Sequence, residues 1–192
     1  MLNILLLGPQ GAGKGTQGRL ISEEISIPHI ATGDMLRTAM ADGSPLGRAV
    51  RPIYDAGQLV PDDLMIDLIR ERLNQADTRN GFVLDGFPRT AVQAEALDDM
   101  LEQIERPLNV VLEFQLPEKV SLERLRRRSG EEGRVDDTEE AIRTRLRLYH
   151  EETEPLIEHY RTRGILVGIP ADRSVEEVFA EIQKALEQAA VR

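Results

Sequence analysis

Residues 8–16 read Gly8-Pro9-Gln10-Gly11-Ala12-Gly13-Lys14-Gly15-Thr16 and directly follow an apolar run at residues 3–7. The stretch matches Gly-x-x-x-x-Gly-Lys, with glycine where serine or threonine usually follows the lysine. Its glycines allow a tight turn whose backbone N–H groups face one anion, and a helix that opens there adds the positive end of its dipole. We therefore interpret it as a phosphate-binding loop (P-loop) between a strand and a helix, with residues Gly11, Ala12, Gly13, Lys14, Gly15 and Thr16 on the phosphates of ATP.

Apolar runs elsewhere in the chain are the other candidate strands. They lie at residues 28–30, 82–84, 109–114 and 165–169. Longer segments with helical spacing separate them, for example Leu64, Leu68, Ile69 and Leu73, and then Val92, Leu97, Leu101 and Ile104. Strands that alternate with helices predict an α/β fold with a five-stranded parallel sheet covered by helices on both faces. We expect one domain over residues 1–192.

Turn and capping residues predict where several helices begin and end. Pro61 and Pro117 suit first helical turns, and Ser174 with Glu177 forms a capping-box pattern. Asp137 with Glu140 forms a second such pattern. Pro155 predicts a break near Glu154 in the helical segment 139–163. Residues 32–60 and a turn at residues 130–137 lie outside the alternation of strands and helices, so we expect both to form flaps.

Composition excludes several classes of protein. The 192 residues carry a formal net charge of −10, which argues against nucleic acid as the main partner. The chain has no cysteine, so disulfides, thiolate catalysis and cysteine zinc sites are excluded. The N-terminus does not resemble a signal peptide, and no stretch approaches the roughly 20 apolar residues of a membrane span. We expect a cytoplasmic enzyme with no membrane partner.

A second anion site is predicted where the run Gly81-Phe82-Val83-Leu84-Asp85-Gly86-Phe87-Pro88-Arg89 leaves the sheet. The strand ends in a carboxylate, so Asp85 should lie at the carboxyl edge near the P-loop, where α/β sheets bind ligands. Asp85 can hold water on Mg²⁺ without ligating the metal directly, and Arg89 can grip a second phosphate group. Taken alone, such an aspartate is more often a turn or cap residue.

Several motifs together resemble the adenylate kinase family in order and spacing. They are the P-loop, Ala31-Thr32-Gly33-Asp34-Met35-Leu36-Arg37, Asp85-Gly86-Phe87-Pro88-Arg89 and Gln93. The resemblance covers essentially the whole chain. It implies Mg²⁺-dependent transfer of the γ-phosphoryl group of ATP to AMP, giving two ADP, by a monomer.

The resemblance also implies an AMP pocket within a helical flap at residues 31–60 and its surroundings. The residues implied are Thr32, Gly33, Arg37, Leu59, Val60, Gly86, Arg89, Gln93, Arg134 and Arg145. Among them Arg89 holds the AMP phosphate and Gln93 reads the adenine edge. Taken singly, Thr32 could be an N-cap, Arg37 a solvated charge and Gln93 an exposed helix position.

Arginines around residues 124–138 are implied to form a short lid over ATP. Arg124 and Arg128 are four apart and share a helical face. The resemblance implies that four arginines neutralise the phosphates during transfer, together with Lys14 and Arg89. These arginines are Arg124, Arg128, Arg134 and Arg145. It also implies that Asp136 and Asp137 orient them. Arg126 and Arg127 fit a solvated face better. Only residues 129–133 separate Arg128 from Arg134, so the extra lid domain and zinc ligands of longer relatives are not expected. Arg173 is implied near the ATP adenine.

Two other functions fit parts of the same pattern. A UMP/CMP kinase would share the fold and the chemistry, but Thr32 and Gln93 favour AMP as the acceptor. A non-catalytic P-loop nucleotide-binding protein would need neither the lid arginines nor a second phosphate site.

Overall fold

Five parallel strands form one sheet in the computed structural model, which describes residues 1–132 and 138–190 of the chain. The strands are β1 (Leu2–Leu7), β2 (His29–Ala31), β3 (Gly81–Asp85), β4 (Val110–Gln115) and β5 (Leu166–Pro170), in the order β2-β3-β1-β4-β5. In the parallel register Leu6 pairs with Asp85, and Asp85 pairs with Ala31. The predicted strands are confirmed, with ends that differ by one residue at most.

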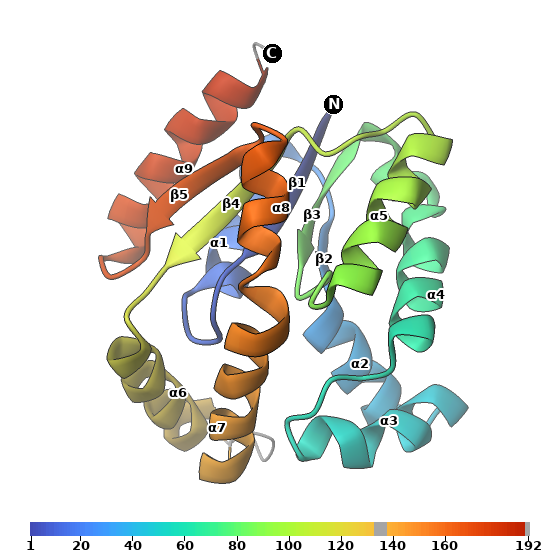
Figure 1. Cartoon of the computed structure of the whole chain (residues 1–192), viewed down its shortest axis with the longest axis vertical. Helices are drawn as coiled ribbons and strands as arrows, with labels where there is room; N and C mark the ends of the chain where they lie inside the picture. Colours follow the sequence, from blue (N-terminus) through green and yellow to red (C-terminus); the bar gives the residue numbers. More distant parts are fainter. Residues whose placement is uncertain (133–137, 191–192) are drawn as a thin grey trace.

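Helices cover both faces of the sheet (Figure 1). They are α1 (Lys14–Ile25), α2 (Thr32–Ala41), α3 (Pro45–Asp55), α4 (Asp62–Leu73), α5 (Ala91–Gln103), α6 (Glu118–Glu132), α7 (Glu139–Leu148), α8 (Leu156–Thr162) and α9 (Val175–Ala190), with a short 3₁₀ helix at Ala76–Asn80. One face packs against α1 and α9 through a cluster that includes Ile4, Ile21 and Ile182. The other face packs against α4, α5 and α8 through a cluster that includes Leu5, Leu97 and Tyr160. The predicted α/β fold is therefore confirmed.

The sequence signals for helix ends were partly correct. Ser174 and Glu177 form the expected capping box, in which each backbone N–H donates to the other side chain. Helix α7 is capped by Thr138, whose Oγ1 accepts from the Ala141 N–H; Asp137, where the sequence predicted a capping box, lies outside the described residues. The break expected near Glu154 is present, because a π-helical turn over Tyr149–Thr153 separates α7 from α8.

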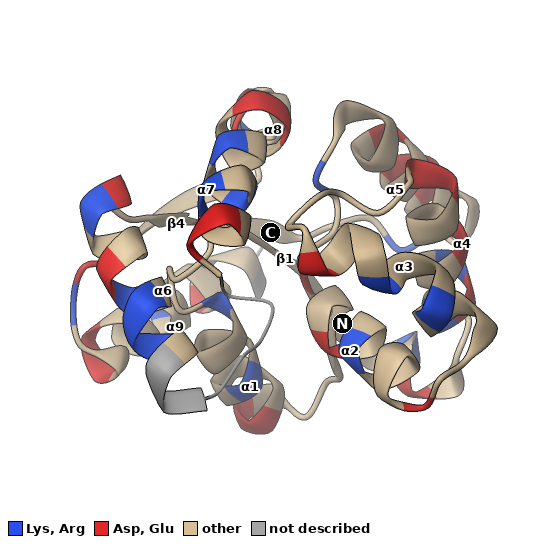
Figure 2. Ribbon diagram, turned by 90° about the horizontal axis from the view of Figure 1, so that it is seen from below, with Lys and Arg blue, Asp and Glu red and all other residues tan. Residues whose placement is uncertain are grey.

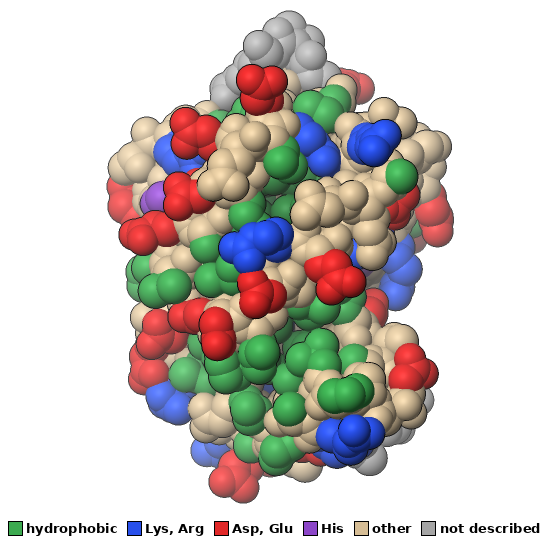
Figure 3. All heavy atoms as spheres, turned by 90° about the vertical axis from the view of Figure 1, so that its right-hand side faces the viewer, with side chains coloured by type: hydrophobic (Ala, Val, Ile, Leu, Met, Phe, Trp, Pro, Cys, Tyr) green, Lys and Arg blue, Asp and Glu red, His purple; other side chains and the backbone are tan. Residues whose placement is uncertain are grey.

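The α4 and α5 side of the molecule mixes hydrophobic and charged side chains (Figure 3). The inward face of α4 consists of Met65, Ile69 and Leu73, so Leu64 lies outside the buried stripe that the spacing suggested. Val92 at the start of α5 is likewise exposed. No helix within residues 1–132 and 138–190 is long and apolar enough to cross a membrane.

Four helices gather beyond the carboxyl ends of the strands. Figure 2 shows α6 and α7 on one side and α2 and α3 on the other, and basic residues lie on all four ribbons. The α1 N-terminus lies at the same end, because it directly follows β1 and the loop at residues 8–13. This end of the sheet therefore brings together basic residues that are far apart in the sequence, among them Lys14, Arg37, Arg124 and Arg145.

Candidate active site

The loop between β1 and α1 is shaped by glycines in left-handed conformations. Gly8, Gly11 and Gly13 have φ values of 142°, 80° and 88°. A Cβ at Gly8 would lie 2.7 Å from the Phe114 carbonyl oxygen, so a side chain there would also collide with β4. The Lys14 ammonium group donates hydrogen bonds to the carbonyl oxygens of Gly8 (2.7 Å) and Pro9 (2.8 Å). The lysine is therefore held over its own loop.

Lys14 also lies in a strongly cationic environment. Burial lowers the pKa of the Lys14 ammonium group, the charge of Asp85 opposes this, and the positive charges of Arg89 and Arg128 add to it, so that the pKa is about 8. Arg89 follows β3 and Arg128 lies on α6, so cations from separate parts of the chain converge on the P-loop lysine. An anion bound there would relieve this repulsion.

Asp85 lies at the carboxyl end of β3, as the sequence predicted. Its carboxylate is 3.7 Å from His29 Nε2 and only 14% exposed. Burial alone would raise the pKa of the Asp85 carboxyl, but the nearby His29 ring and the charges of Lys14 and Arg89 hold it below its usual value. Asp85 is therefore ionised at neutral pH. A Cβ at Gly15 would be 3.8 Å from its Oδ2, so the start of α1 passes close to the carboxylate.

Arginines 37, 89 and 145 surround Tyr54 on α3. Arg37 donates to the Tyr54 hydroxyl and to the Asp34 carboxylate, and Arg145 donates to the Tyr54 carbonyl oxygen at 3.1 Å. The Arg145 guanidinium also stacks over the Tyr54 ring, with its Cζ 5.3 Å from the ring centroid. Burial lowers the pKa of Arg89, and Arg145 and Arg37 lower it further. Arg37 and Arg145 are therefore both near enough to repel Arg89.

The smaller residues of the expected AMP pocket lie around this cluster. Thr32 is buried, and its hydroxyl donates to the Asp85 carbonyl oxygen at 3.2 Å. It is the first residue of α2 and not an N-cap, because Ala31 occupies that position. A Cβ at Gly86 would overlap Thr32 Oγ1, and a Cβ at Gly33 would lie 3.3 Å from Arg37 Nη1. Leu59 and Val60 precede α4, and Val60 is buried.

Gln93 is 2% exposed, so the alternative that it is an exposed helix position is wrong. Its Oε1 accepts from the Arg89 backbone N–H at 2.8 Å. Its Nε2 donates to Asp62 Oδ1 at 2.7 Å, and the same Asp62 oxygen accepts from Thr90 Oγ1 at 3.0 Å. Each polar atom of the Gln93 amide thus holds one hydrogen bond within the protein. Each keeps one more donor or acceptor position for a ligand.

The lid arginines are only partly described. Arg124 on α6 donates to the Gly11 carbonyl oxygen at 3.5 Å, and its guanidinium is 3.9 Å from Asp172. Helix α6 continues through Glu132, so the turn predicted to begin at residue 130 is wrong at its start. Arg134, Asp136 and Asp137 lie outside the described residues.

Arg126 fits the solvated role that was predicted for it and for Arg127. Arg126 pairs with Glu139 at 2.8 Å, and both side chains are exposed. The Arg173 side chain is also exposed, and its guanidinium lies 4.0 Å from the Glu181 carboxylate. Its expected place at the ATP adenine stays a prediction.

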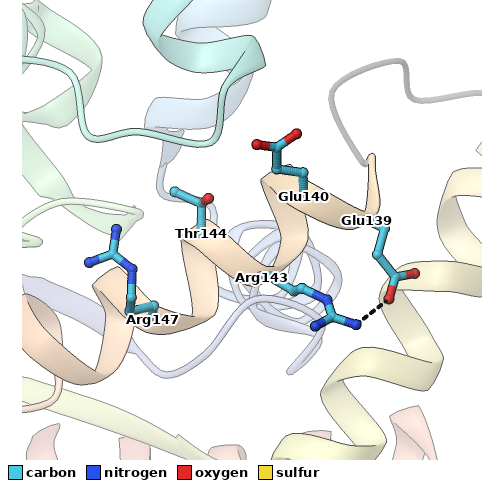
Figure 4. A pocket seen from close by; sticks show the side chains of 5 residues that line it. All are labelled: Glu139, Glu140, Arg143, Thr144 and Arg147. Atoms are coloured by element: carbon cyan, nitrogen blue, oxygen red, sulfur yellow. Dashed lines mark hydrogen bonds and ion pairs between the residues drawn. The ribbon is translucent and has the colours of Figure 1, made fainter.

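The described surface has two hollows away from these groups. One of about 460 Å³ lies along α7 and is lined by Glu139, Glu140, Arg143, Thr144 and Arg147 (Figure 4). Arg143 turns toward Glu139 and pairs with it at 3.0 Å. A second hollow of about 380 Å³ reaches from Pro9 to Tyr149 and Ile157. Neither is lined by Lys14, Asp85 or Arg89.

Three residues of this region were not identified from the sequence. His29 belongs to a short strand, Tyr54 to a helix with no motif, and Asp62 to a helix start, where an acidic residue is common. Their importance comes from distant partners: Asp85, Arg145 and Gln93 respectively. No local pattern in the sequence signals those contacts.

Comparison with known proteins agrees with this geometry. The family model described as adenylate kinase matches residues 6–165. A protein of Corynebacterium aurimucosum named adenylate kinase is 49% identical over 177 residues, which cover 92% of this chain and 94% of the relative. Adenylate kinases of Cyanothece sp. (46% over 188 residues; 98% and 96% covered) and Archaeoglobus fulgidus (41% over 214 residues; 97% and 99% covered) are similar along nearly their full lengths. The chain belongs to the adenylate kinase family.

Proposed function

We propose that this protein is an ATP:AMP phosphotransferase, which moves the γ-phosphoryl group of ATP to AMP and forms two ADP. The observation that carries the proposal is the convergence of cations from two sites. Lys14 of the P-loop is close enough to Arg89 for the arginine to lower its pKa, and Arg89 is similarly close to Arg37 and Arg145. One continuous cationic region can therefore hold a donor phosphate chain and an acceptor phosphate side by side.

Phosphoryl transfer leaves little covalent work to the protein, so positioning and charge neutralisation must supply the rate. In this proposal Lys14, Arg124 and Arg128 neutralise the ATP phosphates, while Arg37 and Arg89 hold the AMP phosphate. Arg145 would act between them, with Arg134 completing the set. The developing charge on the transferred group then meets fixed cations, which need no reorganisation during the reaction.

Mg²⁺ is the proposed cofactor, and the donor set near the P-loop fits it. Asp85 is ionised, half-buried and close to the start of α1, so it can hold metal-bound water. No cluster of three or more His, Asp or Glu side chains that could hold a metal occurs within residues 1–132 and 138–190. Mg²⁺ characteristically keeps several waters and binds through substrate phosphates, where it neutralises charge.

Two segments are proposed to close over the substrates. Residues 31–60 would cover AMP and residues 124–138 would cover ATP, which would keep water from accepting the phosphoryl group. We propose that the protein acts as a monomer, as the resemblance to the family implies. We propose that it works in the cytoplasm.

Substitution of Lys14 by alanine should nearly abolish phosphoryl transfer. The ammonium group contacts only loop carbonyls, so its removal leaves no buried apolar side chain without its packing. We expect kcat/KM to fall by about a hundredfold or more, while circular dichroism and thermal unfolding stay close to wild type. A folded variant with wild-type turnover would contradict the role of Lys14.

Binding of ATP should weaken above about pH 8. Below that pH Lys14 is already charged, whereas above it the free enzyme must take up a proton before the lysine can pair with phosphate. With the pKa at about 8, affinity should fall roughly thirtyfold by about pH 9.5. Calorimetry with ATP over this range checks the profile, and Lys14→Ala is the control, because its profile should be flat. A flat profile in the wild type would overturn the prediction.

Tyr54→Phe should weaken AMP binding and spare ATP binding. The substitution removes the hydroxyl that accepts from Arg37 but keeps the ring under Arg145 and the backbone carbonyl. Loss of one hydrogen bond to a charged group predicts a rise of roughly tenfold in the KM for AMP. Steady-state kinetics with each substrate varied in turn measure both constants. Equal rises for ATP and AMP would show that Tyr54 does not act through the AMP arginines.

The acceptor specificity tests the proposed function itself. A pocket that hydrogen-bonds adenine should reject smaller bases, so AMP should exceed CMP and UMP by orders of magnitude in kcat/KM. A coupled assay for ADP at fixed ATP gives these values, and Gln93→Leu should raise the KM for AMP more than that for ATP. Comparable turnover of CMP or UMP would favour the pyrimidine kinase function. No ADP with any acceptor would favour a non-catalytic nucleotide-binding protein.

A further inference from the structure

Asp62 lies at the start of α4, outside the motifs that identify the family. Its Oδ1 accepts two hydrogen bonds from the α5 region, one from Gln93 Nε2 at 2.7 Å and one from Thr90 Oγ1 at 3.0 Å. The carboxylate also lies in the first turn of α4, where a negative charge interacts favourably with the helix dipole. A charged acceptor makes these bonds stronger than a neutral one would. We propose that Asp62 is a positioning residue that fixes the Gln93 amide for recognition of the adenine of AMP.

The hydrogen bonds of Gln93 allow only one orientation of its amide. In the observed orientation Nε2 faces the Asp62 carboxylate and Oε1 faces the Arg89 N–H. A half-turn of the amide would place Oε1 against a carboxylate and Nε2 against an N–H group, so neither contact would be a hydrogen bond. Asp62 and the Arg89 backbone therefore act together against the reversed orientation.

A fixed amide orientation determines which purine can pair with it. An amide has two N–H donors and two acceptor positions, and Asp62 and Arg89 use one of each. The remaining donor and acceptor match adenine, whose exocyclic amine donates and whose neighbouring ring nitrogen accepts. Guanine carries the opposite arrangement, an oxygen beside a ring N–H, and would need the amide reversed. In this way Asp62 would favour AMP over GMP without touching either nucleotide.

The position of Asp62 also connects recognition to the flap. Val60, the last residue of the proposed AMP flap, is buried two residues before Asp62, and α4 follows at once. Thr90 caps α5 by accepting from the Gln93 N–H at 3.2 Å while it donates to Asp62. The end of the flap and the start of α5 are thus joined through one carboxylate oxygen. This inference rests on the proposed function, because it assigns Gln93 to the AMP base.

Asp62→Ala is the primary variant. It leaves the Thr90 hydroxyl and one Gln93 donor without their acceptor, and it frees the amide to turn. We expect the KM for AMP to rise roughly tenfold and the ratio of kcat/KM for AMP to that for GMP to fall roughly tenfold. The KM for ATP and kcat at saturating AMP should stay within about twofold of wild type. Calorimetric titration with AMP alone gives the same comparison without turnover.

Matched variants separate positioning from general effects. Asp62→Asn keeps an oxygen that can accept from both donors, so its AMP constants should stay within about threefold of wild type. Asp63→Ala removes a carboxylate from the same helix end. The Asp63 side chain is exposed and accepts from the Leu64 N–H, not from Gln93. It should behave as wild type. If Asp62→Ala does not fold, Asp62→Ser keeps a helix-start residue but is too short to reach Gln93, and the same losses are expected.

A double-mutant cycle decides whether Asp62 acts through Gln93. If it does, Asp62→Ala should add almost nothing to the AMP defect of Gln93→Leu, because the group that it positions is already gone. Independent, multiplying effects would overturn the inference, as would an unchanged AMP to GMP ratio in Asp62→Ala or an equal defect in Asp63→Ala. A different result would contradict the proposed function itself: a wild-type protein that makes no ADP from ATP and AMP.

Discussion

Repulsion among cations at the carboxyl end of the sheet is the constraint on which the rest of this structure depends. The charges of Arg89 and Arg128 lower the pKa of Lys14, and the charges of Arg145 and Arg37 lower the pKa of Arg89. Such a cluster weakens the folded state unless other groups hold it or an anion fills it. Several groups around the cation cluster stabilise it in the absence of a bound phosphate.

Neutral and acidic groups perform that task without neutralising the site. The Gly8 and Pro9 carbonyls hold the Lys14 ammonium group, the Tyr54 ring and carbonyl hold Arg145, and the charge of Asp85 opposes the lowering of the Lys14 pKa. Carbonyl oxygens and ring faces are weaker partners than carboxylates. Incoming phosphates can therefore replace these carbonyls and the ring with a net gain, whereas the Asp34 carboxylate would compete with a phosphate for Arg37.

The sequence predicted the scaffold well because the signals for it are local. Apolar runs mark the strands, Pro155 marks the break before α8, and the glycine spacing of residues 8–16 marks the P-loop. It did not predict the α7 cap at Thr138, since Asp137 and Thr138 are both good caps and only the path of the chain selects one. In α4, Ile69 and Leu73 are buried as the spacing suggested, but Met65 is buried in place of Leu64. Leu64 and Met65 are both apolar, and packing against α5 determines which of them is buried.

The candidate site was predictable to a different extent. Residues with a motif, such as Lys14, Asp85 and Arg89, were found and lie together, whereas Tyr54 and Asp62 were not found. Both act through partners that are distant in the sequence: Arg145 is 91 residues from Tyr54 and Gln93 is 31 from Asp62. Topology alone brings such pairs together, and one sequence carries no record of it.

Tyr54 and Asp62, two of the residues that motifs did not reveal, share a physical role. A guanidinium or an amide on a flexible side chain has many orientations of similar energy, and fixing one of them costs conformational entropy. Tyr54 and Asp62 restrict Arg37, Arg145 and Gln93 in the free protein, so this entropy is already lost before a ligand binds. Binding energy that would otherwise be lost in ordering these groups remains available for affinity and specificity. Residues that contact nucleotide are then only part of what makes the pocket selective. The rest lies in groups such as the Asp62 carboxylate, which determine how the contacting groups point.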